Sequence, residues 1–500
     1  MPPGQIASPD MGPRSSARRV LLASNRGPVS FTLDYDGQLS VRRGGGGMVS
    51  GLASVASQAD VLWICAALGD ADRAAARRSP GGLLGLDGAA GGAGVQMLDI
   101  PSGTFQRAYN AVANSTLWFV HHMLYDTPNQ PHFGLAFRRE WDSFRAYNAA
   151  FARALAADAD PAGPGRPQRA MVQDYHLTLV PRMLAELRPD IKIAHFTHTP
   201  WAPPEYYRML PDAVGREVLA GILGADHAGF LCQRWAGAFV DCCEVILGAD
   251  VDRARQQVSY AGRVTSIGVH PLGVQADELI ARAAEPDVQV RVDALAEAAG
   301  GRRLVVRIDR TELSKNIVRG LAAYRELLVT HPEWRGQVMH VAFAYPSRHD
   351  LPEYREYTAC VQRMARQIED EFGTDDWNPL ILEVNDDYAR SLAAYRLADV
   401  LLVNPIRDGM NLVAKEGPIL SDRACALVLS TEAGAAAELG PWALLVNPFD
   451  VTGTAEALHE ALIMEDSERR RRAAALAQAA SALPPAQWFA DQLDALDQPG

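Results

Sequence analysis

Cysteine is scarce in this sequence, and positive charge is not in excess. The six cysteines form no CxxC pair and no Cys/His cluster with zinc spacing, which favours buried, reduced thiols. The net charge is −12 without a long basic stripe, so binding to the phosphate backbone of nucleic acid is not expected. An anionic ligand would therefore need a local cationic pocket.

Long apolar runs are also missing. The sequence contains no run of about 18 apolar residues, the length that could span a bilayer. The first 18 residues also lack the apolar stretch of a signal peptide. Those 18 residues, rich in Pro, Gly, Ser and Arg, are expected to form a frayed tail. The sequence predicts a soluble, cytoplasmic protein without a membrane partner. Its oligomeric state is left open, with a homo-oligomer among the alternatives.

The composition is that of a globular protein, with 48% apolar and 22% charged residues. A chain of 500 residues exceeds the size of one ordinary hydrophobic core, so two domains are expected. The stretch Val264–Val274 contains two glycines and a proline and is predicted to be the hinge. We expect a first domain over residues 19–270 and a second over residues 271–482.

Short apolar runs alternate with longer helical patterns, which is typical of βαβ units on parallel sheets. In the first half the predicted strands are Arg19–Ala23, Val61–Ala66, Ala170–Gln173, Ile191–Thr197 and Gly229–Cys232. In the second half they are Arg303–Ile308, Val338–Ala342, Leu380–Val384, Val400–Val403, Ala426–Leu429 and Ala443–Val446. Ligand-binding motifs are expected directly after such strands, in a cleft between the two sheets.

A glycine loop follows the first strand. Ser24–Gly27 comes first, and Arg42–Gly47 opens what is predicted to be the first long helix. Consecutive glycines let backbone N–H groups approach phosphate or sugar oxygens. Neither GxGxxG nor the P-loop pattern is present. The loop is explained equally well as a ligand cradle or as a flexible turn.

Polar side chains follow two further strands. Asp174–His176 and His198–Pro200 each come after a predicted strand of the first half, where they can hydrogen-bond sugar hydroxyls. By itself, His198 is better explained as a core histidine bonded to the backbone. Two polar strand ends in one predicted sheet weaken that explanation.

Arg310 and Lys315 lie five residues apart, after the first strand of the second half. Two cations there could clamp a diphosphate and neutralise the charge on it as it leaves. A solvated loop, with ion pairs to Asp309 and Glu312, explains the spacing equally well.

The segment Arg407–Glu416 (RDGMNLVAKE) is the most informative one, and it follows the strand Val400–Val403. Its glycine turn is predicted to direct backbone amides and Asp408 into the cleft. A helix would then carry Glu416 about two turns further on, where a carboxylate can accept both ribose hydroxyls. A ligand site is favoured over a surface loop.

Several DxD triplets and a Gly/Ala-rich stretch are assigned no chemistry. Such triplets hold a metal in some sugar-nucleotide enzymes, but Asp70–Asp72, Asp158–Asp160 and Asp250–Asp252 end no predicted core strand. They are predicted to be solvated turns or helix caps, and neither a metal nor another cofactor is expected. Gly81–Gly94 is predicted to be a surface loop.

RDGMNLVAKE resembles the nucleotide-sugar motif of the trehalose-6-phosphate synthases. Other motifs that resemble this family, in the same order, are Ser24–Arg26, the glycine loop, Tyr109–Asn110, Leu117–Trp118, Asp174–His176, His198 with Pro200, Arg310 with Lys315, Ser347–Arg348 and Val446–Pro448. The resemblance covers roughly residues 19–495. It implies an α/β protein of the GT-B fold, with two Rossmann-like doubly wound domains facing across a deep cleft. A helix around Trp488, within residues 483–500, would cross back to the first domain.

The resemblance also implies the roles of individual residues. The residues implied for the phosphate of the acceptor, glucose 6-phosphate, are Arg26, Tyr109, Trp118 and Arg348. Asp174 would hold acceptor hydroxyls. The residues implied for the nucleotide-glucose donor are Gly46, Gly47, Arg310 and Lys315 at the diphosphate, Asp408 with the nearby amides of Asn411, Leu412 and Val413 at the glucosyl group, and Glu416 at the ribose. His198 would touch the transferring sugar.

The implied reaction forms α,α-trehalose 6-phosphate with retention of the donor's anomeric configuration. Double displacement needs a carboxylate nucleophile, and no residue here demands that role. Front-face substitution is therefore preferred, in which the acceptor attacks from the side where the diphosphate departs.

Two motifs depart from the common family pattern. HTPWAPPE at His198–Glu205 stands where members often read HIPFPTPE, and RTELSKN at Arg310–Asn316 stands for RLDYSKG. Both look more like the actinobacterial branch, in which GDP-glucose use is expected, so the resemblance favours GDP-glucose over UDP-glucose as the donor of this chain. Glucosylglycerol-phosphate synthases and cyclitol-coupling pseudo-glycosyltransferases stay as alternatives. A non-catalytic sugar-phosphate sensor or subunit is weakened by the presence of Arg310, Lys315, Asp408 and Glu416.

Overall fold

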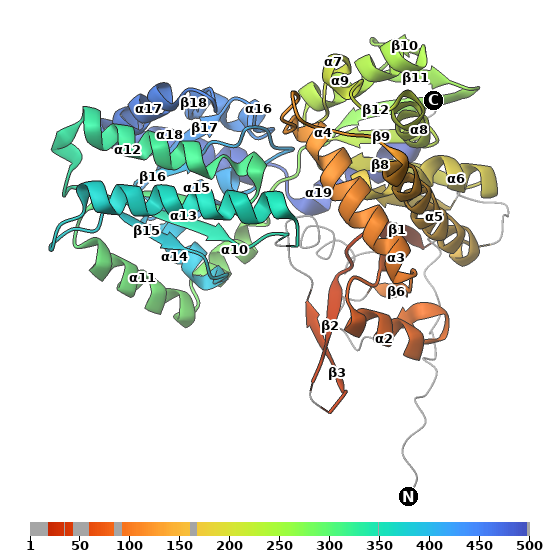
Figure 1. Cartoon of the computed structure of the whole chain (residues 1–500), viewed down its shortest axis with the longest axis horizontal. Coiled ribbons are helices and arrows are strands. Elements are labelled where there is room, and N and C mark those ends of the chain that lie inside the picture. Colours follow the sequence, from red (N-terminus) through yellow and green to blue (C-terminus); the bar gives the residue numbers. More distant parts are fainter. Residues whose placement is uncertain are drawn as a thin grey trace, which may run out of the picture.

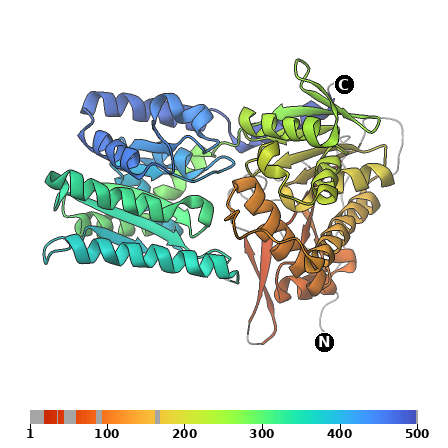
Figure 2. The ribbon, with the colours of Figure 1, turned by 45° about the horizontal axis from the view of Figure 1, so that its top comes forward.

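A computed structural model describes residues 19–34, 36–43, 60–84, 93–160, 168–348 and 350–497. The chain forms two α/β lobes, each built on its own sheet (Figure 1). In both views the lobes lie side by side, and the two long helices of residues 317–372 cross one face of the second lobe (Figure 2). Among the described residues no helix is both long and apolar enough to cross a membrane. The predicted α/β architecture is confirmed.

The first sheet has ten strands in the order β10-β11-β12-β9-β8-β7-β1-β4-β6-β5. Their bounds are β1 Val20–Ser24, β4 Val61–Ala66, β5 Leu83–Leu84, β6 Gly94–Leu98, β7 Arg169–Gln173, β8 Lys192–Thr197, β9 His227–Phe230, β10 Asp250–Asp252, β11 Gln257–Tyr260 and β12 Arg263–Val269. The central strands are parallel, while β5, β10 and β11 pair antiparallel at the edges. β1 and β4 are buried along their whole length, as expected for parallel strands covered on both faces.

The helices of the first lobe are α2 Asp70–Arg78, α3 Ser102–Gln106, α4 Trp118–His122, α5 Leu135–Asp158, α6 Val180–Leu187, α7 Pro204–Tyr207, α8 Asp212–Ile222 and α9 Gln233–Cys242. A further helical segment, Arg107–Leu117, joins α3 to α4. A two-stranded ribbon, β2 Val29–Leu33 with β3 Leu39–Arg43, projects from this lobe (Figure 2).

The second sheet has six parallel strands in the order β15-β14-β13-β16-β17-β18. Their bounds are β13 Arg303–Arg310, β14 Val338–Tyr345, β15 Leu380–Glu383, β16 Val400–Val403, β17 Ala426–Ser430 and β18 Leu444–Val446. The helices are α10 Ala276–Ala283, α11 Pro286–Ala299, α12 Ile317–Thr330, α13 Pro352–Phe372, α14 Tyr388–Leu397, α15 Val413–Leu420, α16 Ala436–Leu439, α17 Val451–Ile463 and α18 Asp466–Ser481.

The last helix, α19 Pro485–Asp497, contacts β8 and β9 of the first sheet. Trp488 is buried in this contact and meets the ring of Phe196 edge-on, with centroids 5.0 Å apart. From Arg19 to Asp497, the described chain therefore runs through the first lobe and then the second, and α19 packs back against the first.

The predicted strands match the structure to within two or three residues, but four interpretations need correction. The predicted hinge is partly wrong, because its residues up to Val269 form β12. Asp250–Asp252 is the edge strand β10 and not a turn. The Gly81–Gly94 stretch contributes β5 and the first residue of β6. Arg42 and Arg43 lie at the end of β3 and not at the start of a helix, while residues 44–59 lie outside the described residues.

The prediction for Asp70–Asp72 is confirmed, whereas two glycines of the predicted ligand loop are not described by the structure. The triplet Asp70–Asp72 does begin a helix, and the Asp72 carboxylate accepts the backbone N–H of Gly69 at 3.1 Å, as a cap. Gly46 and Gly47 of the glycine loop lie outside the described residues.

Candidate active site

Lys315 and Asp408 form an ion pair beyond the carboxyl ends of two neighbouring strands. Lys315 ends a short helical turn after β13, Asp408 follows β16, and Nζ donates to Oδ2 over 2.5 Å. Both side chains are only 16% exposed. Burial acts to lower the pKa of Lys315, but Asp408, Asp309 and Glu312 outweigh it and raise the pKa. Sequence spacing suggests Asp309 and Glu312 as ion-pair partners in this loop, but it does not predict the pairing of Lys315 with Asp408.

Asn411 fixes the loop that carries Asp408. Its backbone lies in the left-handed region, with φ +81°, which asparagine tolerates better than most residues. Its Nδ2 donates to Asp408 Oδ2 over 3.1 Å, and its Oδ1 accepts the N–H of Ala414 over 3.2 Å. The loop is thereby tied to α15, which Val413 begins directly after Leu412.

The same loop touches the first lobe through Gly409. A Cβ at this position would overlap the carbonyl oxygen of His198, so only glycine allows the approach. The indole of Trp235, in α9, donates to the Gly409 carbonyl over 2.9 Å. The carboxyl ends of the two sheets therefore meet in direct backbone contact, as the cleft predicted from the motifs requires.

On the first-lobe side of this contact, Asp174 and His198 are neighbours. Asp174, with φ +74°, accepts the backbone N–H of His198 over 3.2 Å. Burial acts to raise the pKa of Asp174, but the nearby imidazole of His176, with Nδ1 3.7 Å from Oδ2, and that of His198 outweigh it, and the pKa of Asp174 is about 2. His198 Nε2 lies 2.9 Å from Gln173 Oε1, and burial lowers the pKa of His198 to about 4. His198 is thus neutral near pH 7 and bonded to a side chain, not to the backbone.

Arg348 reaches from the second lobe to the first. Its guanidinium lies 4.8 Å from the ring centroid of Trp118 and donates to the hydroxyls of Tyr354 at 2.6 Å and Tyr175 at 3.4 Å. Cation–π contact and hydrogen bonds hold the charge in place. Its backbone also has a positive φ of 46°.

Tyr109 and Arg26 both lie near His176, which also feels the charge of Arg348. The Tyr109 ring stacks on that of His176 with centroids 5.6 Å apart. Burial lowers the pKa of His176, and the charges of Arg348 and Arg26 lower it further. Arg26 is exposed. The five residues expected around the acceptor come from the segments that follow β1, β7 and β14 and from the Arg107–Trp118 region.

Arg310 is not part of the Lys315 pair. It is 62% exposed and forms an ion pair with Glu312 at 3.2 Å. Glu312 is buried and also accepts a hydrogen bond from Ser347 Oγ over 2.9 Å. Burial acts to raise the pKa of Glu312, but Arg310, Arg348 and Lys315 outweigh it, and the pKa is about 2. Sequence reasoning considered Glu312 only as a loop ion pair and missed its place among three cations.

Glu416 lies in the first turn of α15, the helix that follows the Asp408 loop. Tyr395 donates its hydroxyl to Glu416 Oε2 over 2.9 Å. Burial raises the pKa of Glu416 to about 7, and the Tyr395 bond only partly offsets that rise. A half-buried carboxyl suits a neutral diol, whose hydroxyls can both donate to it.

The two departures from the family pattern have structural explanations. Asn316 has φ +58°, and its Nδ2 donates to the carbonyls of Asn404 at 3.0 Å and Pro448 at 2.7 Å. It therefore adopts a glycine-like conformation and also satisfies two buried acceptors. Trp201 is fully buried and packs edge-on against Phe239 at 5.0 Å. Its place is in the core of the first lobe.

A group of three metal-ligand side chains among the described residues lies elsewhere. It consists of His331, Glu333 and His459, at the end of α12 and on α17. The two histidine rings stack with centroids 3.7 Å apart, and His459 Nδ1 accepts a hydrogen bond from the indole of Trp334 over 3.0 Å. These side chains do not belong to the cleft residues.

The model of glycosyltransferase family 20 matches residues 18–498. The chain belongs to this family. A relative from Schizosaccharomyces pombe, an α,α-trehalose-phosphate synthase (UDP-forming), is 31% identical over 92% of this chain and 86% of its own length. A probable α,α-trehalose-phosphate synthase (UDP-forming) 2 from Arabidopsis thaliana is 33% identical over 92% of this chain. The chain spans about half the length of that relative, 54%, and 51% of a bifunctional synthase/phosphatase from Thermoproteus tenax.

Solved structures agree with the family assignment. A trehalose-6-phosphate protein from E. coli, bound with UDP-2-fluoro glucose, matches with a TM-score of 0.84 at 26% identity, over 97% of this chain and 100% of that chain. An α,α-trehalose-phosphate synthase (UDP-forming) from Burkholderia vietnamiensis matches with a TM-score of 0.80 at 28% identity, over 96% and 100% of the two chains. The resemblance drawn from the motifs and the expected GT-B fold of this family 20 member are confirmed.

The raised pKa of Glu416 predicts a pH-dependent stability. The folded protein holds this proton up to about pH 7, whereas the unfolded chain releases it near 4.5, so the stabilisation is complete below 4.5 and lost as the pH rises to 7. We expect the free energy of unfolding of the wild type, relative to Glu416→Gln, to fall by up to about 3 kcal/mol over this range. Denaturant titrations of both proteins measure it. A difference that is constant with pH would contradict the prediction.

Proposed function

We propose that this family 20 member is a retaining glucosyltransferase that joins a nucleotide-activated glucose to glucose 6-phosphate and forms α,α-trehalose 6-phosphate. The observation that carries the proposal is the Lys315–Asp408 pair, held by Gly409 against the strand end that bears His198 and Asp174. In this proposal residues 19–270 hold the acceptor, residues 271–482 hold the donor, and 483–500 return to the first domain. The names of the relatives from S. pombe and A. thaliana support it.

The donor would lie along the carboxyl edge of the second sheet. Lys315 is buried and charged, so it can bind the diphosphate and stabilise the charge that develops as the diphosphate leaves. Arg310, exposed beside it, would add a forked donor, together with the amides near Gly46 and Gly47. Asp408 would accept glucosyl hydroxyls and Glu416 the ribose hydroxyls.

The acceptor would lie against the first lobe. Arg348 has a forked set of donors next to the hydroxyl of Tyr175, and Arg26 is an exposed cation near the same group. Together with Tyr109 and Trp118 they would bind the phosphate, while Asp174, kept ionised by its low pKa, would accept sugar hydroxyls.

Transfer would follow a front-face route. The diphosphate departs, positive charge develops on the glucosyl ring, and the acceptor hydroxyl attacks from the same side and passes its proton to a phosphate oxygen. His198 is neutral, so it can hydrogen-bond the transferring sugar without opposing that positive charge. Catalysis then consists mainly of positioning and charge stabilisation.

Loss of Lys315 tests the proposed role at the diphosphate. Lys315→Ala should lower the rate of transfer by a factor of about 10² to 10³, the usual scale for one charge-stabilising group. The assay follows nucleotide release that depends on glucose 6-phosphate. Lys192→Ala is the matched control, because Lys192 is 45% exposed and pairs with Asp226 at the far end of β8. Near-normal turnover of a folded Lys315→Ala protein would overturn the assignment.

The acceptor should be recognised by its phosphate. Arg348→Ala is expected to raise KM for glucose 6-phosphate by at least about tenfold, since one charge-assisted contact of about 1.5 kcal/mol or more is lost. Free glucose should be a very poor acceptor for the wild type. Arg366→Ala, on the exposed face of α13, should leave KM unchanged. An unchanged KM in Arg348→Ala, or glucose serving equally well, would contradict the acceptor assignment.

For the donor base we propose uridine, so that UDP-glucose is the substrate. Two motifs of the sequence favour GDP-glucose by resemblance, but Trp201 lies in the core of the first lobe and Asn316 donates to loop carbonyls. Neither position therefore supports a guanine preference, whereas the relatives named above are UDP-forming. The measurement is kcat/KM for both donors at saturating glucose 6-phosphate. A clear preference for GDP-glucose would restore the first expectation and leave the synthase proposal intact.

A further inference from the structure

An arginine-rich cavity of about 580 Å³ opens at the edge of the second sheet opposite the candidate active site. Arg303 begins β13, Asp399 directly precedes β16, and Ala424 lies two residues before β17, so the cavity lies at the amino ends of three parallel strands. Lys315 and Asp408 lie beyond the carboxyl ends. A strand of eight residues such as β13 separates the two edges by about 25 Å.

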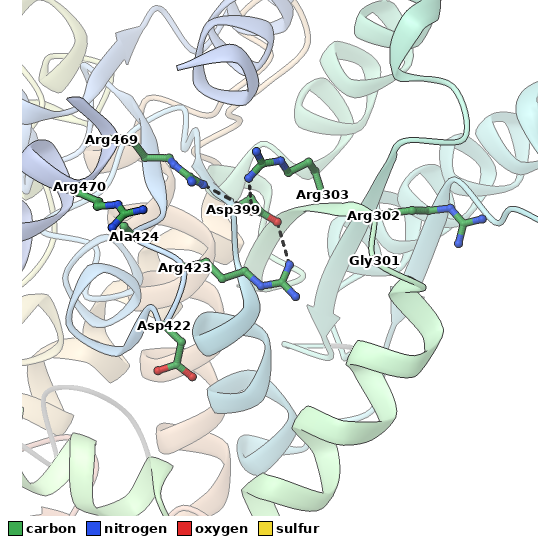
Figure 3. A pocket seen from close by; sticks show the side chains of 9 residues that line it. All are labelled: Gly301, Arg302, Arg303, Asp399, Asp422, Arg423, Ala424, Arg469 and Arg470. Atoms are coloured by element: carbon green, nitrogen blue, oxygen red, sulfur yellow. Dashed lines mark hydrogen bonds and ion pairs between the residues drawn. The ribbon is translucent and has the colours of Figure 1, made fainter. Parts of the chain in front are cut away.

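Asp399 organises the cavity. It is buried and accepts the backbone N–H of Leu304 over 2.8 Å. Its carboxylate also contacts the guanidinium groups of Arg303 at 2.9 Å, Arg423 at 3.0 Å and Arg469 at 3.6 Å. Figure 3 shows these three side chains converging on it from different parts of the fold. One carboxylate therefore holds three cations in fixed positions.

Positive charge is in excess around this centre. Asp422 pairs with Arg396 at 2.8 Å, and Asp466 contacts both Arg469 at 2.7 Å and Arg470 at 3.8 Å. Arg302 points away from the others in Figure 3 and is not counted. The remaining group has five arginines and three aspartates: Arg303, Arg396, Arg423, Arg469 and Arg470, with Asp399, Asp422 and Asp466. The Nε of Arg469 is buried and has no hydrogen-bond partner among the residues that the structure describes. In a chain with a net charge of −12, this excess is local.

We infer that this cavity binds a compact phosphate-bearing anion, and that a diphosphate group is the chemical class it selects. Guanidinium groups offer forked N–H donors that match phosphate oxygens, and Asp399 uses only part of the donors of Arg303 and Arg423. Asp399 is buried and ion-paired with Arg303, Arg423 and Arg469, so its own charge is offset while it orients the three guanidinium groups. The volume is that of a small-molecule site.

The proposed site is independent of the transfer reaction, because its residues lie at the opposite edge of the sheet. A bound anion would bridge β13, the segment before β17 and α18. Binding to the folded state alone stabilises that state. The anion should therefore raise the melting temperature of the full-length chain at constant ionic strength.

Equilibrium dialysis of radiolabelled pyrophosphate against the full chain tests the site, with UDP at saturation to occupy the donor side. We expect a UDP-resistant binding site that is weakened at least about tenfold in Arg423→Gln and in Arg470→Glu. Arg470 is 75% exposed, so its replacement leaves the fold intact. Arg366→Gln is the matched control and should bind pyrophosphate like the wild type.

UDP binding should be the same in all four proteins, which shows that the donor side is intact. Absence of UDP-resistant binding in the wild type, or equal binding in the wild type and both cavity variants, overturns the proposal. Inorganic phosphate is dialysed in parallel. If it binds as tightly as pyrophosphate, the selection of a diphosphate is wrong.

Discussion

The candidate site depends on one close backbone contact, between Gly409 of the second lobe and the His198 carbonyl of the first. No side chain fits at position 409, and the Trp235 indole of the first lobe donates to the Gly409 carbonyl. Because this loop also carries Asp408, the contact fixes where Asp408 lies relative to both sheets. A larger residue would push the loop away and move the carboxylate from Lys315. The geometry of the cleft therefore rests on van der Waals exclusion at one position.

Buried charges in this cleft keep one another ionised. Lys315 stays charged because Asp408 faces it, and Glu312 stays charged because arginines approach it from two directions. Isolated ions would be strongly disfavoured there, whereas alternating signs offset the cost of burial. The site is thus prepared for an anionic ligand before one binds, since Lys315 and Arg348 need not acquire protons. His198 and Glu416 are the contrasting groups, which burial shifts toward their neutral forms.

The second sheet presents cations at both ends of its strands, but in different ways. At the carboxyl ends, Arg310 is the exposed last residue of β13, and Lys315 lies in the short helical turn that follows it. At the amino ends, Arg303 and Arg423 are fixed by one buried carboxylate, Asp399. Loops after parallel strands can vary without breaking the sheet, which explains why the chemistry collects there.

The sequence by itself determined the strand positions and the order of the motifs, because buried parallel strands require apolar runs and ligand loops require polar residues directly after them. It also placed Asp174, His198, Arg310, Lys315 and Asp408 near one cleft. Tertiary structure alone decided the partners: Lys315 meets Asp408 across 93 residues, and Arg348 reaches Tyr175 across 173. Short edge strands such as β10 also escaped prediction. Local pattern sets local conformation, whereas long-range pairing is fixed only when distant segments pack together.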